Sequence, residues 1–345
     1  MSYYPKEELI LTTFNALILE EQDDSRIATT VKSISTDSLS TGDVLLKVAY
    51  SSVNYKDALA TQKKSGVIRN YPIIPGIDLV GTIVEPGDSQ YRTGETVIVT
   101  GYGLGVAHSG GYADYARVPS DWLTALPNGL TEKESMALGT AGLTAALSVN
   151  AIERQGLRQK PNSRILVTGA SGGVGSLAIG ILVKLGYTNI TALTRKSETA
   201  HDYFKQLGVT TVLSAQEFNA KPAKPLMAQN FDYVIDTVGG SQLEHILPQI
   251  SYGGSISLCG NAGGISFNST VLPYILRGVN LLGIDSVNIS SEKRLYIWNR
   301  LGTDMKPDNL SQYIKSELTL NELPEAFSDL LEGRMTGRYL VLLNS

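Results

Sequence analysis

The sequence is poor in the residues that form disulfides and structural metal sites. Its 345 residues include one cysteine, Cys259, and three histidines, so neither an internal disulfide nor a multi-thiolate zinc site is available. Acidic residues outnumber basic ones by 33 to 29, which gives a formal charge of −4 and no basic excess to attract nucleic acids or anionic lipids. These deficits exclude disulfide scaffolds and zinc ribbons.

Long apolar runs are also missing. No stretch approaches the roughly 20 consecutive apolar residues of a membrane span, and residues 1–10 lack the apolar core of a signal peptide. The chain is nonetheless 42% hydrophobic, which is too apolar for a disordered protein, and its length corresponds to roughly two domains. We therefore expect a cytoplasmic, glycine-rich α/β protein with no membrane and no nucleic-acid partner.

The first part of the chain, residues 1–137, has the pattern of short strands separated by turns. Prolines and glycines such as Pro86 and Gly94 punctuate apolar or β-branched runs. These runs lie at 14–19, 44–50, 77–84 and 96–100. Strands at this spacing, with few helical periods, predict a small barrel-like β domain.

From Leu138 onward, short apolar runs alternate with helix-length segments. The runs lie at 164–168, 190–193, 233–236, 256–259 and 281–284. This alternation predicts a parallel, doubly wound sheet over residues 138–284. A helical segment at 291–301 and a final strand at 337–343 follow. We expect residues 285–345 to rejoin the first domain, so that the doubly wound part is an insertion.

A glycine cluster between the strand at 165–168 and the next helix is the sharpest local signal. Gly172 and Gly173 remove side chains where a pyrophosphate must approach the backbone, and Gly175 lets the helix pack closely on the strand. This context predicts a dinucleotide-binding loop. The alternative is an ordinary tight turn between strand and helix.

The end of the following strand bears on which dinucleotide is bound. An NAD site usually has Asp or Glu there to bind the ribose 2′-hydroxyl, whereas this chain has Thr194, Arg195 and Lys196. One hydroxyl and two cations suit a 2′-phosphate, so the sequence favours NADP(H) over NAD(H). The alternative is that Arg195 and Lys196 are solvated charges at a helix start, and the nearby Glu198 weakens the argument.

Polar and aromatic residues gather at Ser51–Asp57, directly after the strand at 44–50. Asn54 and Tyr55 are able to donate hydrogen bonds to a carbonyl group, and Asp57 is able to pair with its neighbour Lys56 or relay a proton. The alternative is a helix start, with Asn54 or Ser52 as N-cap and Asp57 in the first turn. Because no catalytic metal site is expected, hydride chemistry here would depend on a cofactor.

Six segments resemble the zinc-free quinone-oxidoreductase group of the medium-chain dehydrogenase/reductase superfamily, and within it the acryloyl-CoA reductase branch. They are SSVNYKDALA (51–60), IRNYPIIPGIDLVG (68–81), TGASGGVGS (168–176), DTVG (236–239), CGNAGG (259–264) and GIDSV (283–287). The resemblance runs nearly end to end. It implies an α/β fold in which a Rossmann doubly wound parallel sheet is inserted in a GroES-like β-barrel catalytic domain, with a cleft active site and a homodimer.

The resemblance also assigns roles to single residues. It implies that Tyr55 contacts NADP and that Asn54, Tyr55 and Asp57 are polar catalytic candidates. Where the 2′-phosphate is held, the family has a Ser-x-Arg-like tripeptide, and one extra residue precedes it here, so Arg195 and Lys196 remain alternatives. The full set of implied cofactor residues is Tyr55, Ser171, Gly172, Gly173, Val174, Thr194, Arg195, Lys196, Asn261 and Ser286.

The activity that the resemblance implies is NADPH-dependent reduction of an activated carbon–carbon double bond, without a metal. Hydride would reach the β-carbon of an α,β-unsaturated carbonyl compound such as acryloyl-CoA, and Asn54, Tyr55 or backbone N–H groups would stabilise the charge that develops on the carbonyl oxygen. The alternatives are an NADPH:quinone oxidoreductase and a non-catalytic NADPH-binding protein. Alcohol dehydrogenation is disfavoured because no metal site can be assembled.

Overall fold

The computed structural model describes residues 13–23, 25–209 and 211–343, which form two compact units. The first unit comprises residues up to Ala125, Leu318–Leu331 and the residues from Val341. The second comprises Leu126–Glu317 and Glu332–Leu340. These limits differ from the predicted boundaries at 137/138 and 284/285, because residues 126–137, 285–317 and 332–340 pack with the second unit.

The first unit is mainly β-structure. Strands β1 (Thr13–Glu21) and β2 (Ile27–Ser35) form an antiparallel pair. In a second, antiparallel sheet the strands lie side by side in the order β3-β4-β5-β7, and β6 also pairs with β3. Its strands are β3 (Val44–Ser52), β4 (Asp78–Glu85), β5 (Thr96–Thr100), β6 (Tyr115–Val118) and β7 (Thr124–Ala125). The strands expected at 14–19, 44–50, 77–84 and 96–100 are all present.

Helices are short in the first unit. They are α1 (Tyr55–Ala60), α9 (Leu323–Leu331) and the 3-10 turns η1 (Thr36–Ser38), η2 (Lys63–Ser65), η3 (Ser120–Trp122) and η7 (Leu320–Glu322). Helix α1 packs against α9. The aromatic rings of Tyr112 and Phe327, on α9, lie 6.0 Å apart between centroids, and both side chains are buried. The core of the unit therefore reaches the loop that contains Tyr112.

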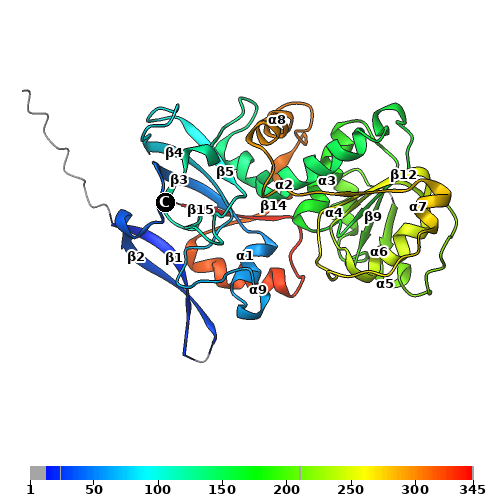
Figure 1. The fold of residues 1–345 in the computed structure, drawn as a ribbon, viewed down its shortest axis with the longest axis horizontal. Helices are drawn as coiled ribbons and strands as arrows, with labels where there is room; N and C mark the ends of the chain where they lie inside the picture. The colour runs from blue at the N-terminus through cyan, green and yellow to red at the C-terminus, as the bar shows by residue number, and fades with distance from the viewer. Residues whose placement is uncertain (1–12, 24, 210, 344–345) are drawn as a thin grey trace, which may run out of the picture. The chain divides into compact units, whose positions relative to one another are not determined.

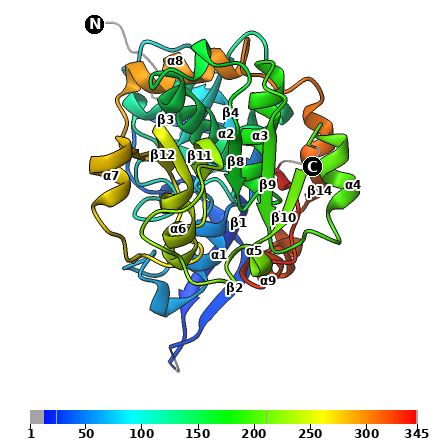
Figure 2. The ribbon, with the colours of Figure 1, turned by 90° about the vertical axis from the view of Figure 1, so that its right-hand side faces the viewer.

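The second unit contains a six-stranded parallel sheet with the order β10-β9-β8-β11-β12-β13. Counted from β8, this is the order 3-2-1-4-5-6 of a doubly wound fold, which confirms the predicted architecture. The strands are β8 (Ile165–Thr168), β9 (Ile190–Thr194), β10 (Thr211–Ser214), β11 (Phe231–Asp236), β12 (Ile250–Leu258) and β13 (Asn280–Gly283). Figure 2 shows β8 and β11 side by side, where the order of the strands reverses.

Helices cover both faces of this sheet. Leu243 and Ile246 of α6 pack with Leu166, Val234 and Ile256 on one face, and α2 and α3 contact strands of the same sheet. In Figure 1 the strands lie between α3 and α6. The helices are α2 (Glu132–Glu153), α3 (Gly173–Lys184), α4 (His201–Gln206), α5 (Ala215–Phe218), α6 (Gly240–Ile246), α7 (Leu272–Arg277) and α8 (Ser291–Leu301), with turns η4 (Leu157–Gln159), η5 (Leu247–Gln249) and η6 (Leu310–Tyr313).

Two further strands follow late in the chain, β14 (Ile314–Leu318) and β15 (Arg338–Leu342). The predicted final strand is therefore present. It belongs to the second unit as far as Leu340 and to the first from Val341, where the N–H of Leu343 donates to the Ala49 carbonyl at 3.1 Å.

Helix α2 is long and apolar. Thr131 and Glu134 form a capping box at its start, and Gly139 interrupts it with non-helical angles (φ 52°, ψ −153°). Among the described residues, α2 is the one helix that is long and apolar enough to cross a membrane. The sequence analysis did not anticipate this helix. The most apolar 18 residues of α2 are 89% buried inside the protein, as expected for a helix in a protein core.

Candidate functional site

The carboxyl ends of β8 and β11 are tied together by buried polar groups. The Thr168 hydroxyl donates to Asp236 Oδ1 at 2.5 Å and accepts from the backbone N–H of Thr237 at 3.0 Å. The other carboxylate oxygen of Asp236 accepts from the N–H of Gly239 at 3.0 Å. Ligands of doubly wound sheets bind outside the carboxyl ends at this reversal of strand order. The loops that would contact a ligand are therefore fixed to each other.

The glycine loop runs from β8 into α3. Gly169 has a positive φ of 55°, and the N–H of Gly172 donates to its carbonyl at 2.9 Å. A Cβ atom at Gly175 would lie 2.5 Å from that same carbonyl oxygen, so the turn requires glycine there. Gly172 stands at the N-cap position of α3 and has no side chain to accept from the first-turn N–H groups. Those groups and the positive end of the helix dipole fit a pyrophosphate.

The loop after β9 adjoins the glycine loop. Ser171 Oγ and Thr194 Oγ1 are 3.1 Å apart, and the Thr194 hydroxyl also accepts from the backbone N–H of Lys196 at 3.1 Å. The structure thus brings together the residues predicted for the pyrophosphate and those predicted for the 2′-phosphate. Arg195 is exposed, whereas the Lys196 ammonium donates to the Met335 carbonyl and to Thr336 Oγ1.

A segment near the C-terminus also belongs to this region, and the sequence analysis missed it. The N–H of Gly337 donates to the carbonyl of Ser171 at 3.1 Å. Arg338 is 2% exposed, its Nε donates to the Ala137 carbonyl at 3.2 Å, and a Cβ at Gly173 would lie 3.0 Å from its Nη1. The sequence did contain one sign of this contact, because Arg338 is a charged residue in an otherwise apolar strand. Its positive charge lies beside the start of α3.

The two remaining predicted cofactor residues lie in different surroundings. Thr144 Oγ1 of α2 donates to Ser286 Oγ at 2.9 Å, and Arg294 donates to the Ser286 carbonyl at 3.4 Å. Asn261 is exposed in the loop after β12, and a Cβ at Gly239 would lie 3.5 Å from its Cα. The Asn261 loop therefore adjoins the loop after β11.

In the first unit, Asn54 and Asp57 lie at the start of a helix, which is the alternative that the sequence analysis gave to a catalytic role. Asn54 is the N-cap of α1, and its N–H donates to Asp57 Oδ2 at 2.8 Å. Its side-chain amide donates to Asp78 Oδ2 at 2.7 Å. Tyr55 is 41% exposed, in contrast to the buried Asn54 and Asp57. Their catalytic roles stay predictions, and of the three Tyr55 has the accessible polar group.

The electrostatics of Asp57 are unusual. Its side chain is buried, and burial together with the nearby charge of Asp78 raises the pKa of Asp57 to about 7, against hydrogen bonds from Asn54, Tyr112 and Ile77 that favour the anion. Perturbed carboxyl groups of this kind gather at functional sites, although buried networks also produce them.

The described part of the chain offers no group of three or more His, Cys, Asp or Glu side chains arranged to hold a metal ion. Cys259 follows β12, and its thiol contacts the Asp236 carbonyl at 3.3 Å. Burial raises the pKa of this thiol to about 12, so it stays protonated at neutral pH.

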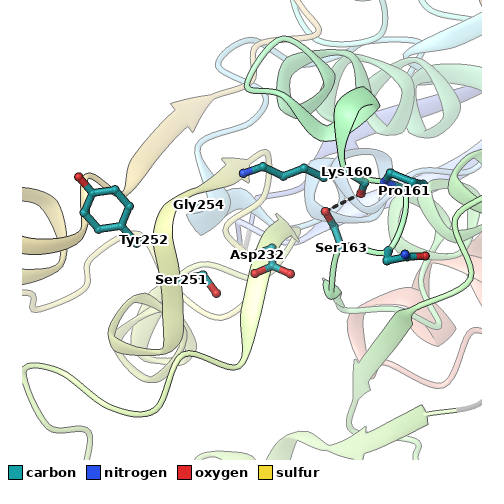
Figure 3. Close-up of a pocket in the computed structure, with 8 residues that line it drawn as sticks. Lys160, Pro161, Ser163, Asp232, Ser251, Tyr252 and Gly254 are labelled. Carbon is teal, nitrogen blue, oxygen red and sulfur yellow. Dashed lines mark hydrogen bonds between the residues drawn. The ribbon is translucent and has the colours of Figure 1, made fainter.

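A separate pocket of about 300 Å³ lies at the opposite ends of the same strands. Lys160–Ser163, Asp232, Ser251, Tyr252 and Gly254 line it. Figure 3 shows Asp232 and Ser251 on neighbouring strands, with Lys160 and Ser163 in the segment that precedes β8. This pocket is at the amino ends of β8, β11 and β12, so it is distinct from the glycine loop.

Comparison with known proteins identifies relatives along nearly the whole chain. The family model of the alcohol dehydrogenase GroES-like domain matches residues 40–128, and that of the zinc-binding dehydrogenases matches residues 173–298. The acrylyl-CoA reductase AcuI of Ruegeria pomeroyi is 43% identical over 333 residues, which cover 96% of this chain and 100% of that protein.

Two solved structures are similarly close. Escherichia coli K-12 YhdH with bound NADPH has a TM-score of 0.90 and 43% identity, covering 95% of this chain and 100% of that one. Bacillus subtilis yhfP with NAD bound has a TM-score of 0.92 and 45% identity, covering 96% and 100%. Both units of the chain are therefore shared with these proteins.

Proposed function

The chain belongs to the acryloyl-CoA reductase branch of the medium-chain dehydrogenase/reductase superfamily, and from this premise we propose that it is an NADPH-dependent reductase of activated carbon–carbon double bonds. The substrate class that we propose is a small α,β-unsaturated thioester such as acryloyl-CoA, after the name of the relative from Ruegeria pomeroyi. The observation that carries the proposal is the glycine loop of α3 next to Thr194 and Arg195, which suits NADPH.

The residues of the second unit would bind NADPH in separate roles. The first-turn N–H groups of α3, at Gly173 and Val174, would hold the pyrophosphate, with the charge of Arg338 behind them. Thr194 and Arg195 would bind the 2′-phosphate. We favour Arg195 over Lys196 for this contact because the Lys196 ammonium already has two oxygen acceptors.

Bound NADPH would supply the hydride that reduces the β-carbon, and the α-carbon would then be protonated. We propose that Tyr55 is the contact of the first unit with bound ligand, since its phenol is exposed. Asn54 and Asp57 would act by fixing the turn that carries Tyr55. Stabilisation of charge on the substrate carbonyl by a donor of this kind is worth about 100- to 1,000-fold in kcat.

We further propose that the protein acts without zinc, in the cytoplasm, as a homodimer. The first point is supported by the position of Cys259, whose thiol lies against the Asp236 carbonyl and belongs to no group of three metal-binding side chains among the described residues. Four exposed apolar side chains precede the edge strand β13 in the sequence and support self-association: Ile265, Val271, Ile275 and Leu276. Light scattering of the purified protein measures the mass directly.

The proposed function is tested by following NADPH oxidation with acryloyl-CoA, a simple enone and a benzoquinone. We expect the highest kcat/KM with the thioester, and NADPH deuterated at the transferred position should place deuterium on the β-carbon of the product. Faster turnover of the quinone would overturn the substrate assignment in favour of a quinone oxidoreductase. Tight NADPH binding without turnover of any acceptor would indicate a non-catalytic binding protein.

A further inference from the structure

A basic segment of the first unit follows the start of α1. Residues 56–69 contain four basic residues and one acidic residue, in a chain whose formal charge is −4. The acidic residue, Asp57, is buried. The basic residues lie nearer the surface: Lys56 is half-buried, and Lys63, Lys64 and Arg69 are exposed. The surface of this segment is therefore cationic in an acidic protein.

One of these four cations is neutralised by a neighbour. Lys63 pairs with Glu21 of β1 at 2.5 Å, and its ammonium lies 5.2 Å from the centre of the Tyr71 ring. Within the described residues, the side chains of the other three cations form neither a hydrogen bond nor an ion pair: Lys56, Lys64 and Arg69. Cations that no carboxylate neutralises attract anionic ligands from solution.

The basic loop, residues 61–70, carries Lys64 and Arg69 and is fixed to the end of α1. The Ser65 hydroxyl donates to the Leu59 carbonyl at 2.7 Å. At the far end of the loop, the Tyr71 hydroxyl donates to the Ala60 carbonyl at 2.8 Å. Both bonds end on the last turn of α1, so the basic loop returns to the helix that it leaves.

An apolar contact holds the same loop against β1. Ile68 is 3% exposed and packs with Ala60 of α1 and Leu19 of β1. It lies in the sequence between the two exposed cations Lys64 and Arg69. Because the backbone between these cations is anchored, less conformational freedom is lost when they bind a ligand than in a mobile loop. The basic loop is thus an ordered cationic surface.

This surface lies a short distance from the residue that we propose to contact substrate. Helix α1 runs from Tyr55 to Ala60, and at about 1.5 Å per residue it separates them by about 8 Å along its axis. Tyr55 is exposed at the start of the helix, and the basic loop begins directly after its end. A ligand that touches both therefore needs an anionic group some way from its reacting end.

We propose that Lys64 and Arg69 of the basic loop, together with Lys56 of α1, bind the phosphate groups of coenzyme A when the acyl thioester lies at Tyr55. Coenzyme A carries a 3′-phosphate and a diphosphate, and its pantetheine arm is longer than α1. Phosphate oxygens accept charge-assisted hydrogen bonds from ammonium and guanidinium groups. The phosphates of NADPH have separate proposed partners in the second unit, so these cations serve the other ligand.

This assignment rests on the proposed function and names the part of the substrate that the first unit recognises. A simple enone or a quinone has no phosphate, so the basic loop contributes nothing to its binding. The same double bond carried on coenzyme A gains the contacts with Lys64 and Arg69. The basic loop thus selects thioesters of coenzyme A among activated double bonds.

Binding is tested without catalysis by calorimetric titration of adenosine 3′,5′-bisphosphate, which reproduces the 3′-phosphate of coenzyme A. The protein is saturated with NADP⁺, so that the dinucleotide site is blocked. We expect the Kd to rise about tenfold in the double variant Lys64→Gln/Arg69→Gln, and to rise with salt in the wild type. Lys47→Gln, which removes an exposed lysine of β3, is the matched control and should leave the Kd unchanged.

Kinetics with two thioesters separates phosphate recognition from chemistry. Acryloyl-pantetheine has the reacting end of acryloyl-CoA but lacks the nucleotide. In the double variant, KM for acryloyl-CoA should rise about tenfold with kcat unchanged, and both constants for acryloyl-pantetheine should stay within about twofold of wild type. The conservative variant Lys64→Arg/Arg69→Lys keeps both charges and should behave as wild type. An equal rise in KM for both thioesters would overturn the proposal.

The outcomes distinguish this proposal from the proposed function. Turnover of acryloyl-CoA with the same KM in wild type and double variant would overturn the phosphate site and leave the reductase assignment standing. Binding of the bisphosphate that the double variant loses, in a protein that reduces no thioester, would support the phosphate site and overturn the reductase assignment. Failure of the wild type to bind the bisphosphate would overturn the phosphate site whatever the protein catalyses.

Discussion

Replacing Arg195 by glutamine removes one exposed cation from the loop after β9, where its guanidinium lies beside Gly333, and leaves the hydrogen bonds of Thr194 in place. A hydrogen bond to a charged group contributes about 1.5–3 kcal/mol, and we expect the lower end because Arg195 is exposed and its charge is screened by solvent. The dissociation constant for NADPH should rise about tenfold, and that for NADH should change by less than about twofold.

Lys196→Gln is the matched comparison. Its ammonium donates to the Met335 carbonyl and to Thr336 Oγ1, so its removal should weaken the contact with residues 335–336 and affect both cofactors alike. Fluorescence titrations with NADPH and NADH, at low and at high salt, measure the two dissociation constants. An unchanged NADPH/NADH ratio in Arg195→Gln, with a collapsed ratio in Lys196→Gln, would refute our assignment. An unchanged ratio in the double variant would refute the 2′-phosphate site itself.

Three further predictions concern the second unit. Gly175→Ala directs a Cβ to 2.5 Å from the Gly169 carbonyl, and we expect it to lower the free energy of unfolding by about 1–3 kcal/mol, measured by urea denaturation. Arg338→Met should weaken NADPH and NADH binding by the same factor, about tenfold, because the pyrophosphate is common to both; a change in their ratio would contradict this role. Burial opposes ionisation of Asp232, but hydrogen bonds from Arg164 outweigh it and lower the pKa of Asp232 to about 2. The stabilisation by this ion pair is present above about pH 4 and is lost as the pH falls toward 2. The melting temperature of Asp232→Asn should therefore change less with pH over that range than the melting temperature of the wild type.

The doubly wound part of the fold was predictable because its central strands are buried on both faces. Such strands are continuous apolar runs, and those at 164–168 and 190–193 correspond to β8 and β9. The helix expected at 291–301 is present as α8. Strand β2 was missed because it contains more polar than apolar residues and none of its residues is fully buried, so it forms no apolar run. The start of α2 was also missed, although its capping box was visible in the sequence.

The site was predictable where it is local in the sequence. Ser171 and Thr194 each follow a recognisable strand, and the sheet order brings the two side chains to 3.1 Å. Arg338 and Asp78 could not be found in this way. Their partners lie far along the chain, and each is a charged residue within a strand, so only the folded structure shows that Arg338 lies beside Gly173 and Asp78 beside Asn54.

The return of residues 332–340 to the second unit has a consequence for synthesis of the protein. Gly337 donates to Ser171, and Arg338 lies beside Gly173, so the glycine loop has these contacts only after residues 337 and 338 have been made. A chain emerging from the ribosome forms its domains in order from the N-terminus. The glycine loop, about 165 residues earlier in the sequence, is therefore synthesised long before the segment that contacts it, and removal of residues 336–345 would take these contacts away.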